Sequence, residues 1–220
     1  MKTIQVKHVA ALSLGITDWK SKAELMMQVA NQAAVSTVNW AEAFPYCPDV
    51  EFYAAWADST FYLLFDVQED TVKAVSTGYQ SPVWEDSCVE FFMQTPDPEE
   101  NTYRNFEFNC IGGVLASVRR SRKDFRSFTD AEMNKLVIHT SLPKQPITTP
   151  RACRWQLLAE IPFEMLGMPN KSPIGRKLRA NFYKCGDKTP TPHYLTWNPV
   201  GTPAPDFHRP EFFGAMEMVD

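Results

Sequence analysis

Hydrophobic and polar residues alternate with a period of two along ten short stretches of the chain, a pattern typical of β-strands that bury one face. The alternation predicts strands over Val50–Ala57, Thr60–Gln68, Ser87–Gln94, Tyr103–Cys110, Gly113–Arg119, Leu136–Thr140, Trp155–Ile161, Arg179–Lys184, His193–Trp197 and Phe212–Met218. Aromatic residues make up 13% of the chain and Pro (17) outnumbers Gly (9), which favours short strands joined by Pro-bearing loops. We therefore expect an all-β fold, a β-sandwich of antiparallel sheets.

Helical spacing is clear in only one segment, close to the N-terminus. Ser21 and Glu24 form a capping-box pattern, and apolar residues follow at helical spacing from Leu25 to Ala33. A second short helical turn is expected from Pro162 to Leu166, because proline is tolerated in the first turn of a helix. The sandwich should thus carry one or two short helices, the first of which covers one end of the sheets.

The 220 residues are expected to form a single domain, residues 1–220. All-β folds often use this length for one domain, and the sequence has no internal repeat, low-complexity tract or long linker. Hydrophobic residues make up 44% and charged residues 22%, which is ordinary globular usage and excludes a disordered or fibrous chain.

The charge pattern argues against nucleic acid as a partner. The chain has 22 Lys and Arg against 26 Asp and Glu, a net charge of −4, and its densest basic cluster, residues 119–123, is short, is followed by Asp124 and is interpreted as a solvated loop. No stretch approaches the roughly 20 apolar residues of a membrane-spanning helix. Residues 9–16 are mildly apolar but lack a convincing signal-peptide cleavage site.

The chain has five cysteines: Cys47, Cys88, Cys110, Cys153 and Cys185. Their number is odd, they are widely spaced and no C-x-x-C motif occurs, so neither a disulfide framework nor a zinc knuckle is indicated. We expect small buried side chains in a reducing compartment.

Period-two alternation places an unusual set of polar side chains on one sheet face. That face carries Asn105, Glu107 and Asn109 on one strand and Arg179, Asn181 and Tyr183 on another. On a third strand, Glu90 shares its face with Trp84, Cys88 and Phe92. These planar polar groups make directional hydrogen bonds, unlike the Lys, Thr and Ser of an ordinary solvated face.

Two interpretations of this face remain open. The first is a plain exposed sheet surface with a few salt bridges. The second is a carbohydrate site, because Trp84 and Trp197 lie at strand ends near the polar strips, and a sugar ring needs flat aromatic surfaces against its C–H faces and polar side chains at its rim. Tryptophan at a strand end can also belong to the core, as we expect for Trp56 and Trp155.

Four stretches carry a family resemblance: Val83–Phe92, Asn105–Asn109, Asn181–Asp187 and Asp206–Gly214. With these motifs the chain resembles carbohydrate-binding module family 9, and in particular the stand-alone family-9-like proteins of Bacteroidetes. The resemblance covers nearly the whole chain, from Trp40 to the C-terminus. It implies a DOMON-like β-sandwich that binds a mono- or oligosaccharide without cleaving it, in the context of polysaccharide breakdown.

The resemblance also implies site residues. Relatives attached to xylanases hold a sugar between two tryptophans, which by motif position are Trp84 and Trp197, with Glu90, Glu107 and Asn109 as polar partners. The resemblance further implies edge contacts from Arg179, Asn181, Tyr183 and Lys184. Glu107 stands where the xylanase modules have Arg, so the sugar specificity is open. Two roles stay open for His208 and Arg209: they contact a ligand, or they anchor the last strand.

The resemblance leaves the metal content and the compartment open. Xylanase modules of the family carry structural calcium, but the scattered acidic residues Asp66, Glu69 and Asp70 form no recognisable calcium loop. We expect no cofactor and leave the metal unassigned. A cytoplasmic location is the default, while relatives attached to secreted enzymes point to the periplasm or the exterior.

Three other functions stay open from the sequence. Glu90 and Glu107 are candidates for the acid and base or nucleophile of a glycoside hydrolase, although no G-x-S-x-G, H-E-x-x-H or G-x-G-x-x-G motif occurs. Some DOMON-like sandwiches bind haem through Met and His, and the chain has nine Met and four His. A protein-interaction module would use Pro-rich loops such as Thr202–Pro205, and protein partners stay unknown.

Overall fold

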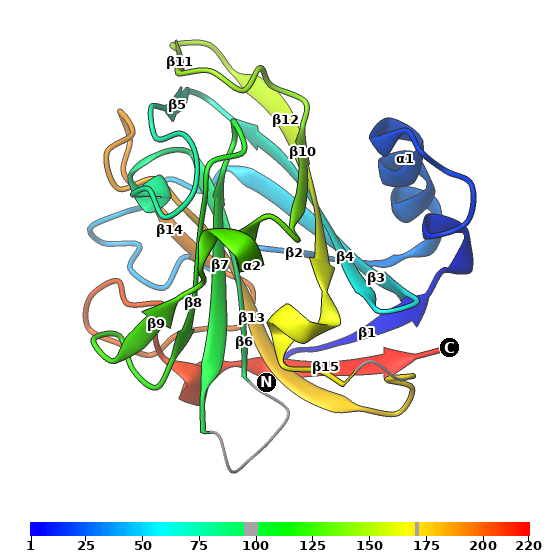
Figure 1. Ribbon diagram of the computed structural model, residues 1–220. Helices are drawn as coiled ribbons and strands as arrows, with labels where there is room; N and C mark the ends of the chain where they lie inside the picture. The colour runs from blue at the N-terminus through cyan, green and yellow to red at the C-terminus, as the bar shows by residue number, and fades with distance from the viewer. Residues whose placement is uncertain (95–100, 170–171) are drawn as a thin grey trace.

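The computed structural model describes residues 1–94, 101–169 and 172–220, and strands dominate it (Figure 1). Its strands are β1 (Thr3–His8), β2 (Asn31–Ala34), β3 (Asp49–Ala57), β4 (Thr60–Glu69), β5 (Val72–Ala74), β6 (Cys88–Gln94), β7 (Tyr103–Asn109), β8 (Val114–Arg119), β9 (Phe125–Ser127), β10 (Val137–Thr140), β11 (Ile147–Thr149), β12 (Cys153–Pro162), β13 (Lys177–Cys185), β14 (Tyr194–Thr196) and β15 (Gly214–Val219). The helices are α1 (Trp19–Val29) and α2 (Asp130–Met133), with 3-10 turns η1 (Ala10–Leu12), η2 (Val83–Glu85), η3 (Phe163–Leu166) and η4 (Pro210–Phe212).

Thirteen of the described strands pair continuously in the order β10-β12-β4-β3-β1-β15-β13-β6-β7-β8-β9, with β2 beside β3 and β14 beside β13. Strands β1 and β15 pair in parallel, as do β1 and β3, whereas the other neighbours are antiparallel. The sheet curls so that the β12-β4-β3 part, the first layer, faces the β13-β6-β7-β8 part, the second layer (Figure 1). The β-sandwich is confirmed, with β1 as a parallel link between its layers.

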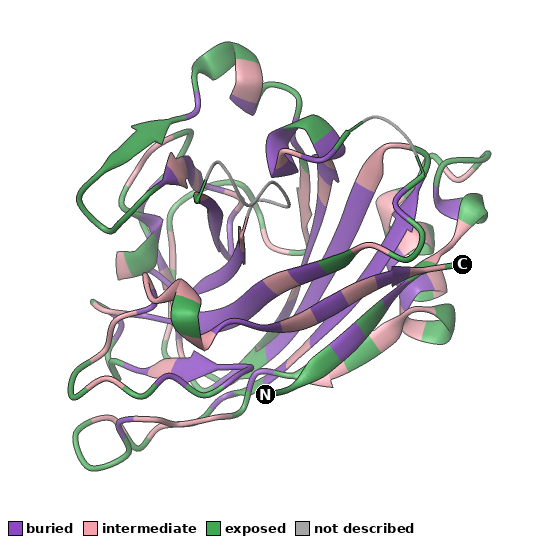
Figure 2. Ribbon diagram, turned by 90° about the horizontal axis from the view of Figure 1, so that it is seen from below, coloured by how far each residue is buried: buried purple, intermediate pink, exposed green. Residues whose placement is uncertain are grey.

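Aromatic side chains fill the space between the two layers. The Phe52 ring of β3 stacks on Phe182 of β13 with centroids 3.7 Å apart, and Phe61 of β4 stacks on Phe91 of β6 at 5.1 Å. All four side chains are fully buried. Figure 2 shows buried positions along the strands and exposed positions concentrated in the connections. This core fixes which strand faces are left for a ligand.

All ten predicted strands are present, with ends that differ by at most two residues. The alternation missed β1, β2, β5, β9 and β11. These are short or polar: every residue of β9 is exposed, and β1 buries only Ile4 and Val6. A strand with so few buried positions carries too few apolar residues to show a period of two.

The N-terminal helix begins three residues earlier than the capping pattern indicated. Asp18 is the N-cap, and its carboxylate accepts a hydrogen bond from the Ser21 backbone N–H at 2.9 Å, so the expected Ser21–Glu24 capping box was wrong. The helix ends at Val29, and Ala33 belongs to β2. It covers the outer face of the first layer through Ala23 and Met26, not an end of the sheets. The short turn after Pro162 is confirmed as η3.

Residues 198–213 (the closing segment) connect β14 to β15 and cover part of the outer face of the second layer. Trp40 Nε1 donates to the Thr202 carbonyl at 2.7 Å, and the Tyr183 hydroxyl donates to the Phe207 carbonyl at 3.1 Å. The Phe207 ring also stacks on Tyr183 with centroids 4.2 Å apart. The closing segment therefore decides which part of this polar face stays open. Among the described residues, no helix has the length and hydropathy needed to span a membrane.

Candidate functional site

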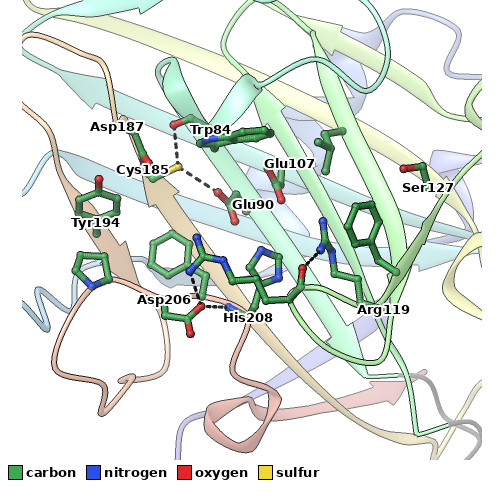
Figure 3. Close-up of a pocket in the computed structure, with 15 residues that line it drawn as sticks. Trp84, Glu90, Glu107, Arg119, Ser127, Cys185, Asp187, Tyr194, Asp206 and His208 are labelled. Carbon is green, nitrogen blue, oxygen red and sulfur yellow. Dashed lines mark hydrogen bonds and ion pairs between the residues drawn. The ribbon is translucent and has the colours of Figure 1, made fainter.

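A pocket opens on the outer face of the second layer, beside the closing segment (Figure 3). Its volume is about 340 Å³, near the lower end of the roughly 300–1,000 Å³ common for small-ligand sites. The residues that line it are Trp84, Glu90, Glu107, Leu115, Arg119, Arg122, Phe125, Ser127, Cys185, Asp187, Tyr194, Pro205, Asp206, Phe207 and His208. They come from β6, β7, β8, β9, β13 and β14, from the turn η2 and from the loops around these elements.

Two carboxylates form the floor of the pocket. Glu90 of β6 and Glu107 of β7 are direct cross-strand partners, so their side chains leave the sheet side by side. Only 3% of Glu90 and 4% of Glu107 is exposed. The Asn105 amide donates to Glu107 Oε1 at 2.8 Å, and the Cys185 thiol donates to Glu90 Oε1 at 3.1 Å. The floor thus presents polar groups that are already held in place.

Burial changes the protonation of this floor. Loss of water, followed by the nearby Cys185 and Glu107, raises the pKa of Glu90 well above its usual value. Desolvation also raises the pKa of Glu107, to about 7, against the opposing effects of the Asn105 hydrogen bond and Arg119. A carboxyl that keeps its proton donates a hydrogen bond as well as accepting one. The floor therefore offers both kinds of partner to a ligand near neutral pH.

The raised pKa of Glu107 predicts that folding stability falls as the pH rises. A carboxyl with a higher pKa in the folded state binds more protons there, so its contribution to the free energy of unfolding decreases from about pH 4.5 to about pH 7. We expect Glu107→Gln to lose less stability than wild type between about pH 5 and about pH 8, and to be the more stable of the two at about pH 8. Urea unfolding at both pH values measures this.

Glu132→Gln is the matched control for this pH dependence. Hydrogen bonds from Arg126 and then from the Thr129 backbone lower the pKa of Glu132 to about 2, so its contribution is complete above about pH 4.5 and is lost only below that. Its replacement should shift stability equally at about pH 5 and about pH 8. If Glu107→Gln gives the same pH slope as wild type, the buried carboxyl is not the source of the slope.

Trp84 lies at the rim of the pocket on the 3-10 turn η2. Its side chain lies above Glu90 and Glu107 in Figure 3, and the residue is 37% exposed. The Trp84 carbonyl accepts a hydrogen bond from the Asp187 backbone N–H at 3.2 Å, which ties η2 to the segment after β13. The indole is therefore partly exposed where it lines the pocket, and that it stacks on a sugar stays a prediction.

The wall around the end of β8 is basic and aromatic. Arg119 donates from Nε to Asn105 Oδ1 at 2.8 Å and from Nη1 to the Arg122 carbonyl at 2.9 Å. Its guanidinium also lies 4.2 Å from the centre of the Phe125 ring. Arg122 pairs with Asp206 of the closing segment at 3.5 Å. The interpretation of residues 119–123 as a solvated loop was therefore wrong for Arg119, which is buried at the end of β8, whereas Arg122 lies in the exposed loop beside the pocket.

His208 both lines the pocket and anchors the closing segment. Its Nδ1 lies 3.0 Å from the Tyr103 hydroxyl, and its ring packs on Phe92 with centroids 5.1 Å apart. Burial, then Arg119 and Arg122, lowers the pKa of His208 to about 3. The imidazole is therefore neutral at ordinary pH, and the charge of this wall comes from the arginines.

Three of the nine predicted site residues, Trp84, Glu90 and Glu107, line the pocket. Asn109 is fully buried, where its amide donates to the Ser76 carbonyl and to Asp86 and its oxygen accepts from the Gly113 N–H. Asn181 is also fully buried and bonds the backbone of Asn198. The prediction that Asn109 and Asn181 contact a ligand was therefore wrong, because their amides already form hydrogen bonds with buried backbone groups.

Arg179, Tyr183 and Lys184 are likewise placed elsewhere. Arg179 donates to the Glu211 and Phe213 carbonyls and lies outside the pocket. Tyr183 points to the pocket face of β13 but is fully covered by Phe207. Lys184 points to the opposite face of β13, where it is fully buried. The expected edge contacts were wrong for all three residues.

Trp197 is part of the hydrophobic core and is 2% exposed. Its ring meets Phe52 and Phe182 edge to face at 6.0 and 5.6 Å. It also lies directly over Gly214, where a Cβ atom would clash with the indole. The expectation of a sugar held between Trp84 and Trp197 was therefore wrong for Trp197. No ligand reaches this ring without opening the sandwich.

Sequence reasoning missed most of the remaining lining residues: Arg119, Arg122, Phe125, Cys185, Asp187, Tyr194, Asp206 and Phe207. Cys185 had a signal, because it continues the Asn181–Tyr183 alternation on the pocket face. Phe125, Asp206 and Phe207 lie outside the predicted strands, and no local pattern shows that they converge.

The fold and the pocket define a class of protein: a β-sandwich with a small-ligand pocket on the outer face of one sheet, built from buried carboxylates under an exposed indole. A family model for carbohydrate-binding family 9 matches residues 20–218. The chain therefore belongs to carbohydrate-binding family 9, as its motifs indicated.

Solved structures agree with this assignment. A candidate carbohydrate-binding protein from Bacteroides uniformis is 32% identical, with a TM-score of 0.88 and 99% of each chain covered. A family 9 module from Caldicellulosiruptor kristjanssonii in complex with glucose is 13% identical with a TM-score of 0.60, covering 99% of this chain and 95% of that one. Its complex with cellotriose aligns with 14% identity, a TM-score of 0.59 and coverages of 99% and 94%. Among curated proteins, none matches the chain.

Proposed function

We propose that residues 1–220 form a single non-catalytic domain that binds one unit of a mono- or oligosaccharide in this pocket and serves polysaccharide breakdown. The indole of Trp84 lies against the sugar ring, and Glu90 and Glu107 bind its hydroxyls. The observation that carries the proposal is an exposed indole above two buried carboxylates in a small pocket. Family membership and the glucose and cellotriose complexes of a family 9 module support a sugar as the ligand.

A single stacking ring requires strong polar contacts. If the sugar removes about 100 Å² of indole surface from water, the gain is about 2.5 kcal/mol, which is less than the roughly 4 kcal/mol or more that association costs. Hydrogen bonds to charged groups contribute roughly 1.5–3 kcal/mol each. Arg119 on the wall and the ionised fraction of Glu107 on the floor supply such groups, and the protonated Glu90 adds a neutral donor and acceptor. Affinity is thus shared between the indole and the polar floor.

The placement of the carboxylates favours binding over cleavage. A glycoside hydrolase places its two carboxyl groups on either side of the scissile bond. Glu90 and Glu107 instead leave adjacent strands side by side, on the same side of the pocket (Figure 3). The residues that line the pocket do not favour haem binding either, because the described ones include one histidine and no methionine.

Isothermal titration calorimetry with glucose, cellotriose and a panel of other mono- and oligosaccharides tests the proposal. We expect saturable binding of at least one sugar by wild type, and an affinity about tenfold lower for Glu90→Gln. The amide keeps the size of the side chain but replaces the carboxyl O–H donor with a weaker N–H donor that points in other directions. Glu42→Gln, at an exposed position outside the pocket, is the control and should bind like wild type.

Two results would count against this function. The first is the absence of binding by a folded wild-type protein across the panel. The second is the release of shorter sugars during prolonged incubation with an oligosaccharide, if Glu90→Gln abolishes that release, because the two carboxylates would then be catalytic.

A further inference from the structure

Three groups with affinity for metal ions converge at the edge of the pocket floor. The thiols of Cys88 and Cys185 and the carboxylate of Glu90 place one ligand atom each within 4.8 Å of one another, and all three residues are buried. Cys88 and Glu90 lie two residues apart on β6 and so share a face. Cys185 of β13 is the direct cross-strand partner of Cys88. The sheet register thus assembles a set that the spacing of the cysteines did not reveal.

The geometry points to a binding site for a borderline-soft divalent cation of the zinc type, held by Cys88 Sγ, Cys185 Sγ and a carboxylate oxygen of Glu90. The metal site shares Glu90 with the proposed sugar site, but the argument for the metal does not rest on sugar binding. Thiolates select zinc over the hard cations calcium and magnesium, which prefer oxygen ligands. The proposal therefore differs in chemistry from a calcium site.

The distances suit a tetrahedral ion. Zinc–sulfur bonds of about 2.3 Å and zinc–oxygen bonds of about 2.0–2.2 Å place neighbouring ligand atoms roughly 3.5–3.8 Å apart. The Cys185 thiol and Glu90 Oε1 are 3.1 Å apart, and the whole set lies within 4.8 Å. Adjustments of about an ångström in side-chain position bring all three atoms to one ion. Cys88 and Glu90 on β6 and Cys185 on β13 all lie in regular strands, so the backbone fixes their positions relative to one another.

The composition of the cluster also favours a cation. Two thiols and a carboxylic acid lie together where they are buried, and each becomes an anionic ligand when it gives up its proton to bind a metal. A bound divalent ion would replace these protons, which pass to solvent, and would neutralise most of the charge of two thiolates and a carboxylate. Lys184, which precedes Cys185 on β13, points to the opposite face and pairs with Glu69.

An ion has a route to the site and an open coordination position. Glu90 and Cys185 line the pocket, whereas Cys88 lies behind them among the buried residues. The three protein ligands therefore leave the fourth tetrahedral position facing the pocket, where water completes it. Three protein ligands with one open position are typical of zinc sites that meet exchangeable ligands.

Titration of the reduced, full-length protein with Co²⁺, followed by competition with Zn²⁺, tests the site. Before titration, thiol counting after denaturation should give all five cysteines as free thiols. We expect one equivalent of Co²⁺ to produce thiolate-to-cobalt charge-transfer absorption and the intense visible bands of tetrahedral Co²⁺, and Zn²⁺ to remove both. Cys88→Ser should weaken metal affinity at least tenfold, while Cys47→Ser, at an exposed cysteine outside the cluster, should match wild type.

A second measurement guards against loss of structure in the variant. Zinc should raise the thermal unfolding temperature of wild type and Cys47→Ser but not that of Cys88→Ser, whose far-ultraviolet circular dichroism should match wild type. Equal cobalt spectra and affinities for wild type and Cys88→Ser would overturn the proposal. Cobalt binding without thiolate charge-transfer absorption would do the same. So would a Cys88–Cys185 disulfide that resists reduction in the folded protein. Sugar titration of wild type in a chelator is run separately, so that failure of the sugar proposal is recognised independently of the metal result.

Discussion

Replacement of Trp84 by Ala is expected to weaken the affinity for the best sugar ligand by about 70-fold. The indole is 37% exposed at the rim and lies above the carboxylate floor. If binding removes about 100 Å² of its surface from water, the substitution loses about 2.5 kcal/mol, which corresponds to about 70-fold in the dissociation constant. Calorimetry with the sugar that binds wild type most tightly measures the change.

Trp19→Ala is the matched control for this substitution. Trp19 is also partly exposed, but it lies on α1 at the outer face of the first layer and stacks on His139 with centroids 6.0 Å apart. Its removal should leave sugar affinity within about twofold of wild type. If Trp84→Ala binds as tightly as Trp19→Ala, the sugar does not lie against this indole. Trp84→Phe, which keeps a smaller ring, should fall between wild type and Trp84→Ala.

The strands of the core could be predicted from the sequence because burial imposes the pattern directly. Phe106 and Phe108 on β7 and Phe182 on β13 face the other layer, and the polar residues between them face outward. The same logic failed for α1, where Asp18 and Ser21 are both good capping residues three positions apart. The local sequence does not show which of these two residues caps the helix. The packing of Ala23 and Met26 on the first layer decides where the helix begins.

The position of the site was only partly visible in the sequence. Alternation identified the face of the second layer and placed Glu90 and Glu107 on it, and the structure brings both to the pocket. The alternation also places Asn181 and Tyr183 on this face, which is correct, but the closing segment covers both side chains. Whether a residue on that face is open or covered depends on a segment whose path is set by long-range contacts, such as Trp40 with Thr202. No period in the local sequence carries that information.

Replacement of Lys184 by Met is expected to destabilise the fold by about 3–5 kcal/mol, the largest effect of any substitution considered. The Lys184 ammonium is fully buried and pairs with Glu69 Oε2 at 3.0 Å. It also donates to His193 Nε2 at 2.7 Å, whose Nδ1 is held by the Thr191 carbonyl, and to the Cys185 carbonyl at 3.0 Å. Met fills much of the space but leaves the buried Glu69 carboxylate without a cation, and removing one partner of a buried pair costs about this much. Urea unfolding at neutral pH measures it.

The double variant Lys184→Met/Glu69→Gln separates lost charge pairing from lost packing. Gln at position 69 removes the unpaired charge while its oxygen still accepts the Trp155 Nε1 hydrogen bond, which Glu69 accepts at 2.8 Å. Most of the stability lost in Lys184→Met should therefore return. Lys135→Met, which breaks an exposed pair with Glu164, should cost less than about 1 kcal/mol. A double variant as unstable as Lys184→Met alone would show that the contacts of the lysine chain, and not its charge, hold β13 against β4 at this end of the sandwich.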